Sequence, residues 1–281
     1  MERTRIRLGG IEINSSVMNA SGPRSAERGE LYELSAVHRG AVVFKSCNLA
    51  GLEQPENLKN SGVEYFAAIA RDLRVRNKIV VGSVVGNSED EIVKVATMLD
   101  RAGANILELN LADDYVMNSV EPFATLERLS SVVGHVRGDT SAALAVKLPP
   151  KGLNFTPAAV ADLMKSLHVS ILVCANDLAK DLDIDIATGQ VKGADRVLSQ
   201  TNAYFRESDS TLDIVAVGGV NTGRDAYLAH LSGAKAVQIG SALIKEGAGA
   251  LGRIDRELEG LLAEYGHRSV LEIIGKVSFT G

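Results

Sequence analysis

The stretch of sequence that decides the fold is IVAVGGVNTGRDAYLAHLSGAKAVQIGSAL, from Ile214 to Leu243. It opens with a β-branched apolar run that ends in Gly218-Gly219, and it closes with a second apolar run that leads into Gly240-Ser241. The residues between the two runs predict a short helix that begins near residues 221–224. An apolar strand, a helix and another apolar strand form the repeating unit of a parallel sheet that is buried on both faces.

Runs of this kind recur along the whole chain. We count eight of them, at residues 17–21, 41–46, 79–86, 106–111, 143–148, 171–176, 214–219 and 236–243. Helical periodicity fills the gaps, for example over residues 89–103 and over residues 158–167, which follow a Thr156-Pro157 cap. Eight strands with helices between them predict a closed (β/α)₈ TIM barrel, because a six-stranded doubly wound sheet would require two of these runs not to be strands.

The N-terminal segment has a different pattern. In residues 4–13, Gly9-Gly10 separates two alternating arms, which predicts a β-hairpin that plugs the amino-terminal end of the barrel. The 281 residues contain no linker and no change of composition. We therefore expect a single domain over residues 1–281.

Composition argues against several classes of protein. The formal net charge is −5, and no cluster of basic residues is present, which argues against a nucleic-acid partner. No apolar run reaches the roughly 18 residues of a membrane span, and the N-terminus lacks a signal-peptide core, so we expect a cytoplasmic protein. Only Cys47 and Cys174 are available as thiols. Neither a metal site nor a disulfide is predicted.

Barrel enzymes carry their reactive groups where strands end and loops begin. In this chain those positions hold polar residues or glycines, namely Asn19, Ser21, Gly22, Lys45, Ser46, Ser83, Asn110, Lys147, Asn176, Gly218, Gly219, Gly240 and Ser241. The loops after the last two strands are the usual phosphate site of such barrels, and glycines let backbone N–H groups approach a phosphate. The alternative is that these glycines only relieve crowding at turns.

Two lysines at strand ends indicate an anionic or electron-rich partner. Burying the ammonium of Lys45 or Lys147 is costly unless it is paired or used. A reduced isoalloxazine ring is one such partner, and a carboxylate such as Glu108 is another. In a third interpretation Lys147 is a Schiff-base nucleophile. The strand-end amides of Asn19, Asn110 and Asn176 are expected to face a planar heterocycle.

Six motifs together resemble the soluble, class 1 dihydroorotate dehydrogenases, which are FMN-dependent (β/α)₈ barrels. They are MNASG (18–22), FKS (44–46), ELNL (108–111), VKLPP (146–150), GGVNTGRDAY (218–227) and GAKAVQIGSALIKEG (233–247). The resemblance implies FMN as the cofactor, bound by Ala20, Ser21, Gly22, Lys45, Ser46, Asn110, Lys147, Gly218, Gly219, Gly240 and Ser241. It implies that Lys45, Asn110, Asn176 and Asp177 contact the substrate.

The chain departs from this family on the substrate side. Where the family has a catalytic Cys or Ser base and a second asparagine, this chain has Asp113, Asp114 and Tyr115. Residues 47–62 replace a longer loop of the family. By position, Asp113 is predicted to be the catalytic base, with Asp114 as second choice. Lys45 and Lys147 are the other predicted catalytic residues. The alternative is that both carboxylates cap the next helix.

These observations predict an FMN-dependent oxidoreductase that moves a hydride and a proton across a C–C bond next to a carbonyl. Dihydroorotate is one expected substrate, which would place the protein in pyrimidine biosynthesis, and a related but different substrate is the other. A soluble acceptor such as fumarate or a partner subunit would take the electrons, and a homodimer is expected by analogy. The alternatives are a phosphate-binding lyase or aldolase that uses Lys147, and a non-catalytic FMN binder.

Overall fold

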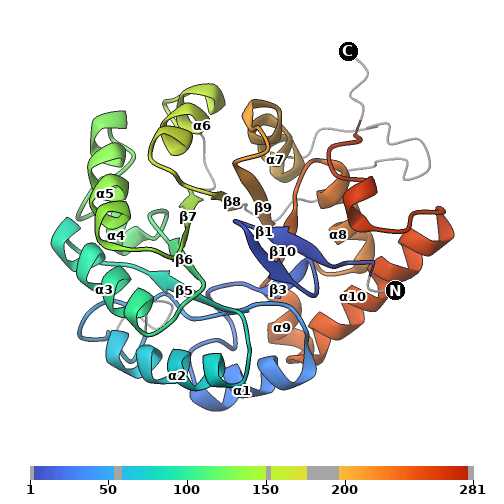
Figure 1. The fold of residues 1–281 in the computed structure, drawn as a ribbon, viewed down its shortest axis with the longest axis horizontal. Helices are drawn as coiled ribbons and strands as arrows, with labels where there is room; N and C mark the ends of the chain where they lie inside the picture. Colours follow the sequence, from blue (N-terminus) through green and yellow to red (C-terminus); the bar gives the residue numbers. More distant parts are fainter. Residues whose placement is uncertain (1–2, 54–58, 150–152, 176–195, 278–281) are drawn as a thin grey trace.

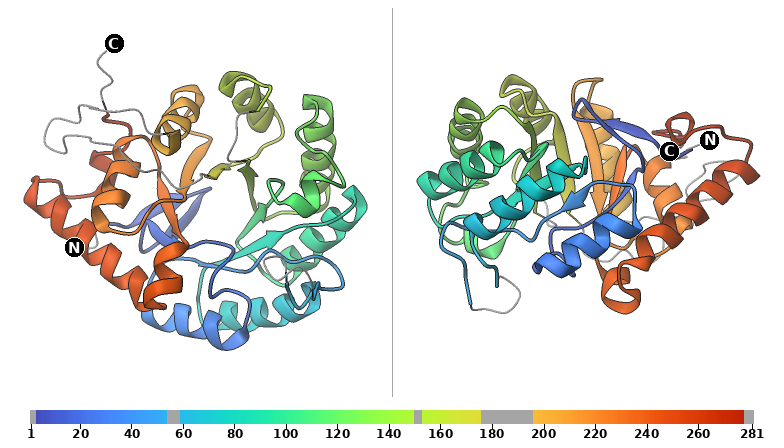
Figure 2. Two further views of the ribbon diagram at one scale, coloured as in Figure 1. Left: turned by 180° about the vertical axis from the view of Figure 1, so that it is seen from behind. Right: turned by 60° about the horizontal axis from the view of Figure 1, so that its bottom comes forward.

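The computed structural model describes residues 3–53, 59–149, 153–175 and 196–277 (Figure 1). Within these residues, eight parallel strands form one sheet in the order β3-β10-β9-β8-β7-β6-β5-β4. The strands are β3 (Val17–Asn19), β4 (Val42–Val43), β5 (Val80–Val84), β6 (Ile106–Leu109), β7 (Ala143–Leu148), β8 (Ile171–Ala175), β9 (Asp213–Val217) and β10 (Ala236–Ile239). The sheet curls into a barrel with the helices outside it, so the predicted TIM barrel is confirmed (Figure 2).

The helices follow the strands in the predicted alternation. They are α1 (Arg28–Val37), α2 (Val63–Val75), α3 (Glu89–Arg101), α4 (Asp114–Met117), α5 (Leu126–Asp139), α6 (Pro157–Ser166), α7 (Arg196–Glu207), α8 (Gly223–Leu231), α9 (Ser241–Glu246) and α10 (Gly249–Glu264), with a final 3₁₀ turn at Val270–Glu272. The Thr156 hydroxyl caps α6 by accepting from the N–H of Ala159. The last predicted apolar run is shorter than expected as a strand, because β10 ends at Ile239 and Ser241 already begins α9.

The predicted N-terminal hairpin lies across the amino-terminal ends of the barrel strands. Strands β1 (Ile6–Leu8) and β2 (Ile11–Ile13) pair antiparallel around the glycine turn. The N–H of Gly9 donates to Asp213 Oδ2 at 2.8 Å, and Asp213 is the first residue of β9. A Cβ built at Gly9 would lie 2.8 Å from Ile171, the first residue of β8. The hairpin therefore plugs the end of the barrel opposite the predicted site.

Side chains close the barrel between the two edge strands of the sheet, β3 and β4. The Asn19 amide donates from Nδ2 to the carbonyl of Val43 at 2.6 Å and accepts from the N–H of Val43 at 2.9 Å. At the start of β3, His38 Nε2 lies 2.8 Å from the carbonyl oxygen of Val17. Asn19 is fully buried. Its amide is used in this seam, so the expectation that it faces a planar heterocycle is wrong.

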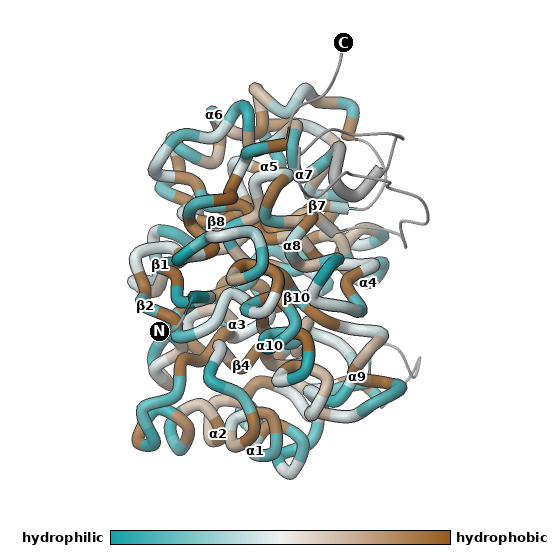
Figure 3. Tube along the Cα trace, turned by 90° about the vertical axis from the view of Figure 1, so that its right-hand side faces the viewer, coloured by the Kyte–Doolittle hydropathy of each residue, from teal (hydrophilic) through white to brown (hydrophobic). Residues whose placement is uncertain are grey.

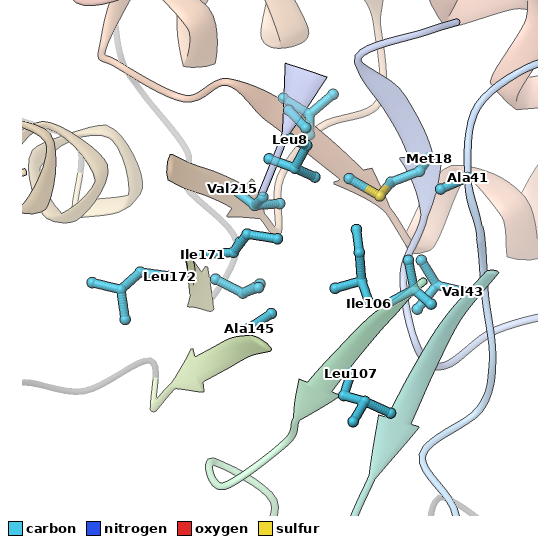
Figure 4. Close-up of a cluster of buried hydrophobic side chains, with 14 of the residues drawn as sticks. Leu8, Met18, Ala41, Val43, Ile106, Leu107, Ala145, Ile171, Leu172 and Val215 are labelled. Atoms are coloured by element: carbon cyan, nitrogen blue, oxygen red, sulfur yellow. The ribbon is translucent and has the colours of Figure 1, made fainter. Parts of the chain in front are cut away.

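Apolar side chains fill the barrel and the space between the sheet and the helices. Figure 4 shows part of this core, in which Met18, Val43 and Ile106 come from β3, β4 and β6. Hydrophilic and hydrophobic segments alternate along the outer helices (Figure 3), as expected when one face of each helix packs on the sheet. No helix among the described residues is long and apolar enough to cross a membrane.

Candidate active site

A buried carboxylate connects three strands at the centre of the site. Glu108, on β6, is only 1% exposed. Its Oε1 accepts from the Ser21 hydroxyl at 3.0 Å, and its Oε2 accepts from Gln238 Nε2, on β10, at 2.6 Å. Lys147 Nζ, on β7, lies 3.7 Å from Glu108 Oε1 and 3.3 Å from Ser21 Oγ. The structure thus brings together Ser21 and Lys147, two residues predicted to contact the cofactor.

The carboxylate partner considered as an alternative for Lys147 is present. Because a buried carboxylate is stable only when its charge is compensated, the ion pair explains how Glu108 is tolerated inside the barrel. The Lys147 side chain is nevertheless 14% exposed, whereas that of Glu108 is 1% exposed. The lysine therefore also reaches the surface of the site, where a ligand can contact it.

Gln238 is a site residue that the strand-end analysis missed. It lies in the middle of β10 and not at its end, and the only signal in the sequence is a lone amide within an apolar run. Its Oε1 is buried and has no hydrogen-bond partner among the described residues. An unsatisfied buried acceptor costs about 1–3 kcal/mol. Its Nε2 donates to Glu108 at 2.6 Å, so this bond orients the amide among the described residues.

A second group of polar side chains lies at the ends of β4, β5 and β6. Asn110 Nδ2 donates to the Ser46 hydroxyl at 2.9 Å, and Ser46 Oγ lies 2.9 Å from Ser83 Oγ. Asn110 Nδ2 is also 3.5 Å from Asp113 Oδ2, at the limit of a hydrogen bond. The structure thus joins two predicted cofactor residues, Ser46 and Asn110, and orients the Asn110 amide toward the predicted base.

Asp113 has a structural role and also faces the site. Its Oδ1 accepts from the N–H of Tyr115 at 3.1 Å and caps α4, so the helix-capping alternative is correct for this carboxylate. Burial raises the pKa of Asp113, while the nearby charges of Lys45 and Lys147 act to lower it. Asp114 is the exposed first residue of α4. Of the two carboxylates, Asp113 therefore lies closer to the polar side chains of the site, and Asp114 lies at the exposed start of α4.

Lys45 follows β4 and is half-buried. Its backbone N–H donates to the carbonyl of Ser25 at 2.8 Å, which fixes the strand end against the loop after β3. Lys45 and Gly22 line one cavity of about 960 Å³, together with residues of the loops after β3 and β4. Two residues predicted to contact the cofactor therefore border the same hollow at the carboxyl ends of the strands.

The two glycine loops after β9 and β10 are joined. Gly218 and Gly219 have φ of 102° and 74°, a conformation that favours glycine. Asn221 Nδ2 donates to the carbonyl of Gly219 at 3.0 Å, and its Oδ1 accepts from the Ser241 hydroxyl at 3.0 Å. A Cβ built at Gly240 would meet only Ala20, at 4.0 Å. The backbone at Gly218, Gly219 and Gly240, with Ser241 beside it, is called the glycine cradle below.

Two predicted substrate residues, Asn176 and Asp177, lie outside the described residues. Tyr115 is a further polar residue whose position the sequence did not indicate. Its hydroxyl interacts with the side chains of Asn48 and Asn87, and burial raises its pKa. Tyr115 thus ties α4 to the loops after β4 and β5.

The fold and the site together define a (β/α)₈ barrel protein that presents lysines, amides and a glycine cradle at the carboxyl ends of its strands. The family model described as dihydroorotate dehydrogenase matches residues 55–262. The chain belongs to the dihydroorotate dehydrogenase family. The resemblance and the class of oxidoreductase predicted from the sequence are therefore confirmed.

Individual relatives agree with this assignment at low identity. The chain is 26% identical over 311 residues to a putative dihydroorotate dehydrogenase A (fumarate) of Streptococcus agalactiae, covering 99% of this chain and 100% of the relative. It is 28% identical to a dihydroorotate dehydrogenase (fumarate) of Lachancea kluyveri, covering 93% and 94%. A crystal structure of the Eimeria tenella enzyme in complex with ferulenol superposes with a TM-score of 0.78 at 15% identity, over 98% of this chain and 88% of that one, which shows the shared fold.

Proposed function

We propose that this protein is an FMN-dependent oxidoreductase of the dihydroorotate dehydrogenase type. The observation that carries the proposal is the junction of Lys147 and Ser21 through Glu108 in a barrel whose last two strands end in the glycine cradle. Gly218, Gly219, Gly240 and Ser241 would hold the phosphate. Ala20, Ser21, Gly22, Ser46 and Asn110 would lie along the ring, with Lys45 and Lys147 against it. FMN, when bound, supplies the hydride acceptor.

In this proposal the chain itself moves the proton. Asp113 accepts it from a carbon next to a carbonyl, and its partial burial makes it a stronger base than an exposed carboxylate. Lys45 and Asn110 orient the substrate, together with Asn176 and Asp177. The charges of the two lysines act on Asp113 in the opposite sense to burial and limit how far its pKa rises.

Two substrates are kept in the proposal. The relatives are named dihydroorotate dehydrogenase (fumarate), which supports dihydroorotate as the hydride donor and a soluble molecule as the electron acceptor. The carboxylate at Asp113, in place of the family's base, supports a related substrate that carries less negative charge than dihydroorotate. A single-domain, cytoplasmic homodimer that acts in pyrimidine biosynthesis completes the proposal.

An anaerobic titration tests both the cofactor and the substrate. The purified protein is expected to be yellow from its flavin and to bleach when its substrate is added in the absence of oxygen. Dihydroorotate and uncharged 5,6-dihydrouracil are added separately, and fumarate is then added to restore the colour. A wild-type protein that purifies colourless and cannot be reconstituted with FMN contradicts the proposal.

A further inference from the structure

The carboxylate of Glu108 is a charged group that the proposed reaction does not use. It is almost fully buried inside the barrel, where a carboxylate is stable only with strong partners. Among the described residues its partners are Ser21, Lys147 and Gln238. Ser21 lies 87 positions from Glu108 in the sequence, and Gln238 lies 130 positions from it. An apolar residue would fill the same space in an ordinary barrel core. The charge therefore calls for an explanation beyond packing.

We propose that Glu108 is a positioning residue, which holds Lys147 and sets how much of its positive charge reaches a bound flavin. The inference rests on the proposed FMN function. Ser21 Oγ, Glu108 Oε1 and Lys147 Nζ form a triangle with sides of 3.0, 3.3 and 3.7 Å, which fixes the ammonium at the strand end.

Gln238 fixes the other half of the carboxylate. Its Nε2 donates to Glu108 Oε2 at 2.6 Å, so the carboxylate cannot turn away from Lys147 without losing this bond. The unpartnered Oε1 of Gln238 shows that its amide is oriented by this bond alone among the described residues. The site thus fixes both the place and the partial neutralisation of the lysine charge.

The consequence is electrostatic. A cation beside a flavin stabilises the negative charge of the reduced ring, and a carboxylate 3.7 Å from that cation weakens the effect. Glu108→Gln keeps the shape and removes the charge. We expect the midpoint potential of bound FMN to become more positive. We also expect sulfite to bind about tenfold tighter or more, because it bonds to oxidised flavin, leaves a negative charge on the ring and bleaches it.

A matched control separates this effect from general destabilisation. Asp255 is also a buried carboxylate, which accepts from the hydroxyls of Thr4 and Ser15 and pairs with Arg39. It contacts the N-terminal segment and not the strand ends that carry the site. Asp255→Asn is therefore expected to lower the urea midpoint of unfolding and to leave the flavin potential and the sulfite affinity of the wild type unchanged.

A double variant keeps the test decisive if Glu108→Gln folds poorly. The neutral combination Glu108→Gln/Lys147→Met removes both charges and is expected to unfold at a higher urea concentration than Glu108→Gln alone. If the losses of apoprotein stability caused by Glu108→Gln and by Lys147→Met alone simply add up in the double variant, the two side chains are not coupled. That result would overturn the proposal whether or not FMN binds. An unchanged potential and sulfite affinity in folded, FMN-loaded Glu108→Gln would overturn it while leaving the proposed function intact. A wild-type protein without FMN affinity contradicts the proposed function instead.

Discussion

The side chain of Asn19 and the backbone of Val43 pair as two strands would. The amide donates to the Val43 carbonyl at 2.6 Å and accepts from its N–H at 2.9 Å, and so stands in for a peptide group where β3 meets β4. Both strands are very short, with three and two residues. A side chain that supplies two hydrogen bonds therefore has a large effect on whether the barrel closes.

Asn19→Ala is expected to destabilise the fold strongly. It leaves the N–H and carbonyl of Val43 without these partners in a buried seam, at a cost of about 2–4 kcal/mol in the free energy of unfolding. Urea unfolding of the apoprotein measures the loss. The control is Asn118→Ala, at an exposed position after α4, which should change stability by roughly 0.5 kcal/mol or less. Equal stability of the two variants would rule out the seam.

Gly240→Val is expected to abolish FMN retention in a folded protein. Gly240 has a negative φ of −118°, and a Cβ there would meet only Ala20, at 4.0 Å, so the fold should accept the added side chain next to the glycine cradle. Gly219 is less suitable for this test, because its φ of 74° makes any larger residue strained. Gly249→Val, where a Cβ meets nothing within 4 Å, is the control. Retention of FMN by Gly240→Val at wild-type affinity would contradict the cradle.

Asp113→Asn separates the proposed base from a helix cap, because the two roles predict different losses. Asparagine caps helices about as well as aspartate, so the fold should be kept. Flavin reduction by the true substrate should slow ~10²-fold or more with FMN still bound. Asp114→Asn is the control and should reduce at the wild-type rate. Cys47 is not an alternative base, because it is fully buried and burial raises its pKa far above neutral.

The same variant has a predicted pH dependence of stability. The pKa of Asp113 is raised in the folded protein above its ordinary value of 3.8. The protonated carboxyl therefore contributes stability below pH 3.8, and this contribution is lost as the pH rises through the pKa of the folded protein. Asp113→Asn is therefore expected to be at least as stable as the wild type at pH 7. Unfolding midpoints at pH 4 and pH 7 measure this, and a lower stability of the variant at pH 7 would show that the carboxylate stabilises the fold.

Lys147 distinguishes redox chemistry from Schiff-base chemistry. A nucleophilic amine must be uncharged, whereas Lys147 is in an ion pair with Glu108. Borohydride treatment in the presence of a small ketose phosphate is thus expected to trap no adduct, and Lys147→Ala should weaken FMN binding at least tenfold. Mass spectrometry of the treated protein reads out the first result. A substrate attached covalently at Lys147 would favour the lyase alternative.

The repeated pattern of apolar runs and helices predicted the barrel because each unit is local in sequence. A strand is recognised from five or six residues and a helix from about ten, so β5 and α3 could be placed without knowing their neighbours. Strand ends were predictable for the same reason. Ser21, Lys147 and Gly240 could be placed at the same end of the barrel, because the carboxyl ends of parallel strands all meet there.

Side-chain direction was not predictable from the same pattern. Asn19 is the last residue of β3 and Ser21 follows two residues later, yet only Asn19 turns into the seam, where its amide bonds to the Val43 backbone that β3 leaves unpaired. Gln238 and Glu108 are joined across 130 residues of sequence. A contact of that kind depends on how far the strands are staggered in the closed barrel, which no local window contains.

His230 provides a test of the fold that is independent of the proposed function. It lies near the end of α8 and is completely buried. Its Nδ1 lies 2.7 Å from the carbonyl oxygen of Ala234, and its Nε2 lies 3.0 Å from the hydroxyl of Ser16, which precedes β3. Since a carbonyl can only accept, Nδ1 carries the proton and Nε2 accepts from Ser16. Burial lowers the pKa of His230 from 6.5 to about 4.

The sign of the pH effect follows from these two values. Between pH 6.5 and pH 4 the unfolded chain binds a proton at this histidine and the folded chain does not, so stability falls as the pH falls, by about 3 kcal/mol over the interval. His230→Asn should be less stable at pH 7 but should lose much less stability on acidification. Part of the slope should remain, because burial also lowers the pKa of His38. His168→Asn, at an exposed site with a φ of 53° that suits asparagine, should keep the wild-type slope. Urea unfolding at half-unit steps of pH measures all three proteins, and a wild-type slope in His230→Asn would show that this histidine is not held neutral in the core.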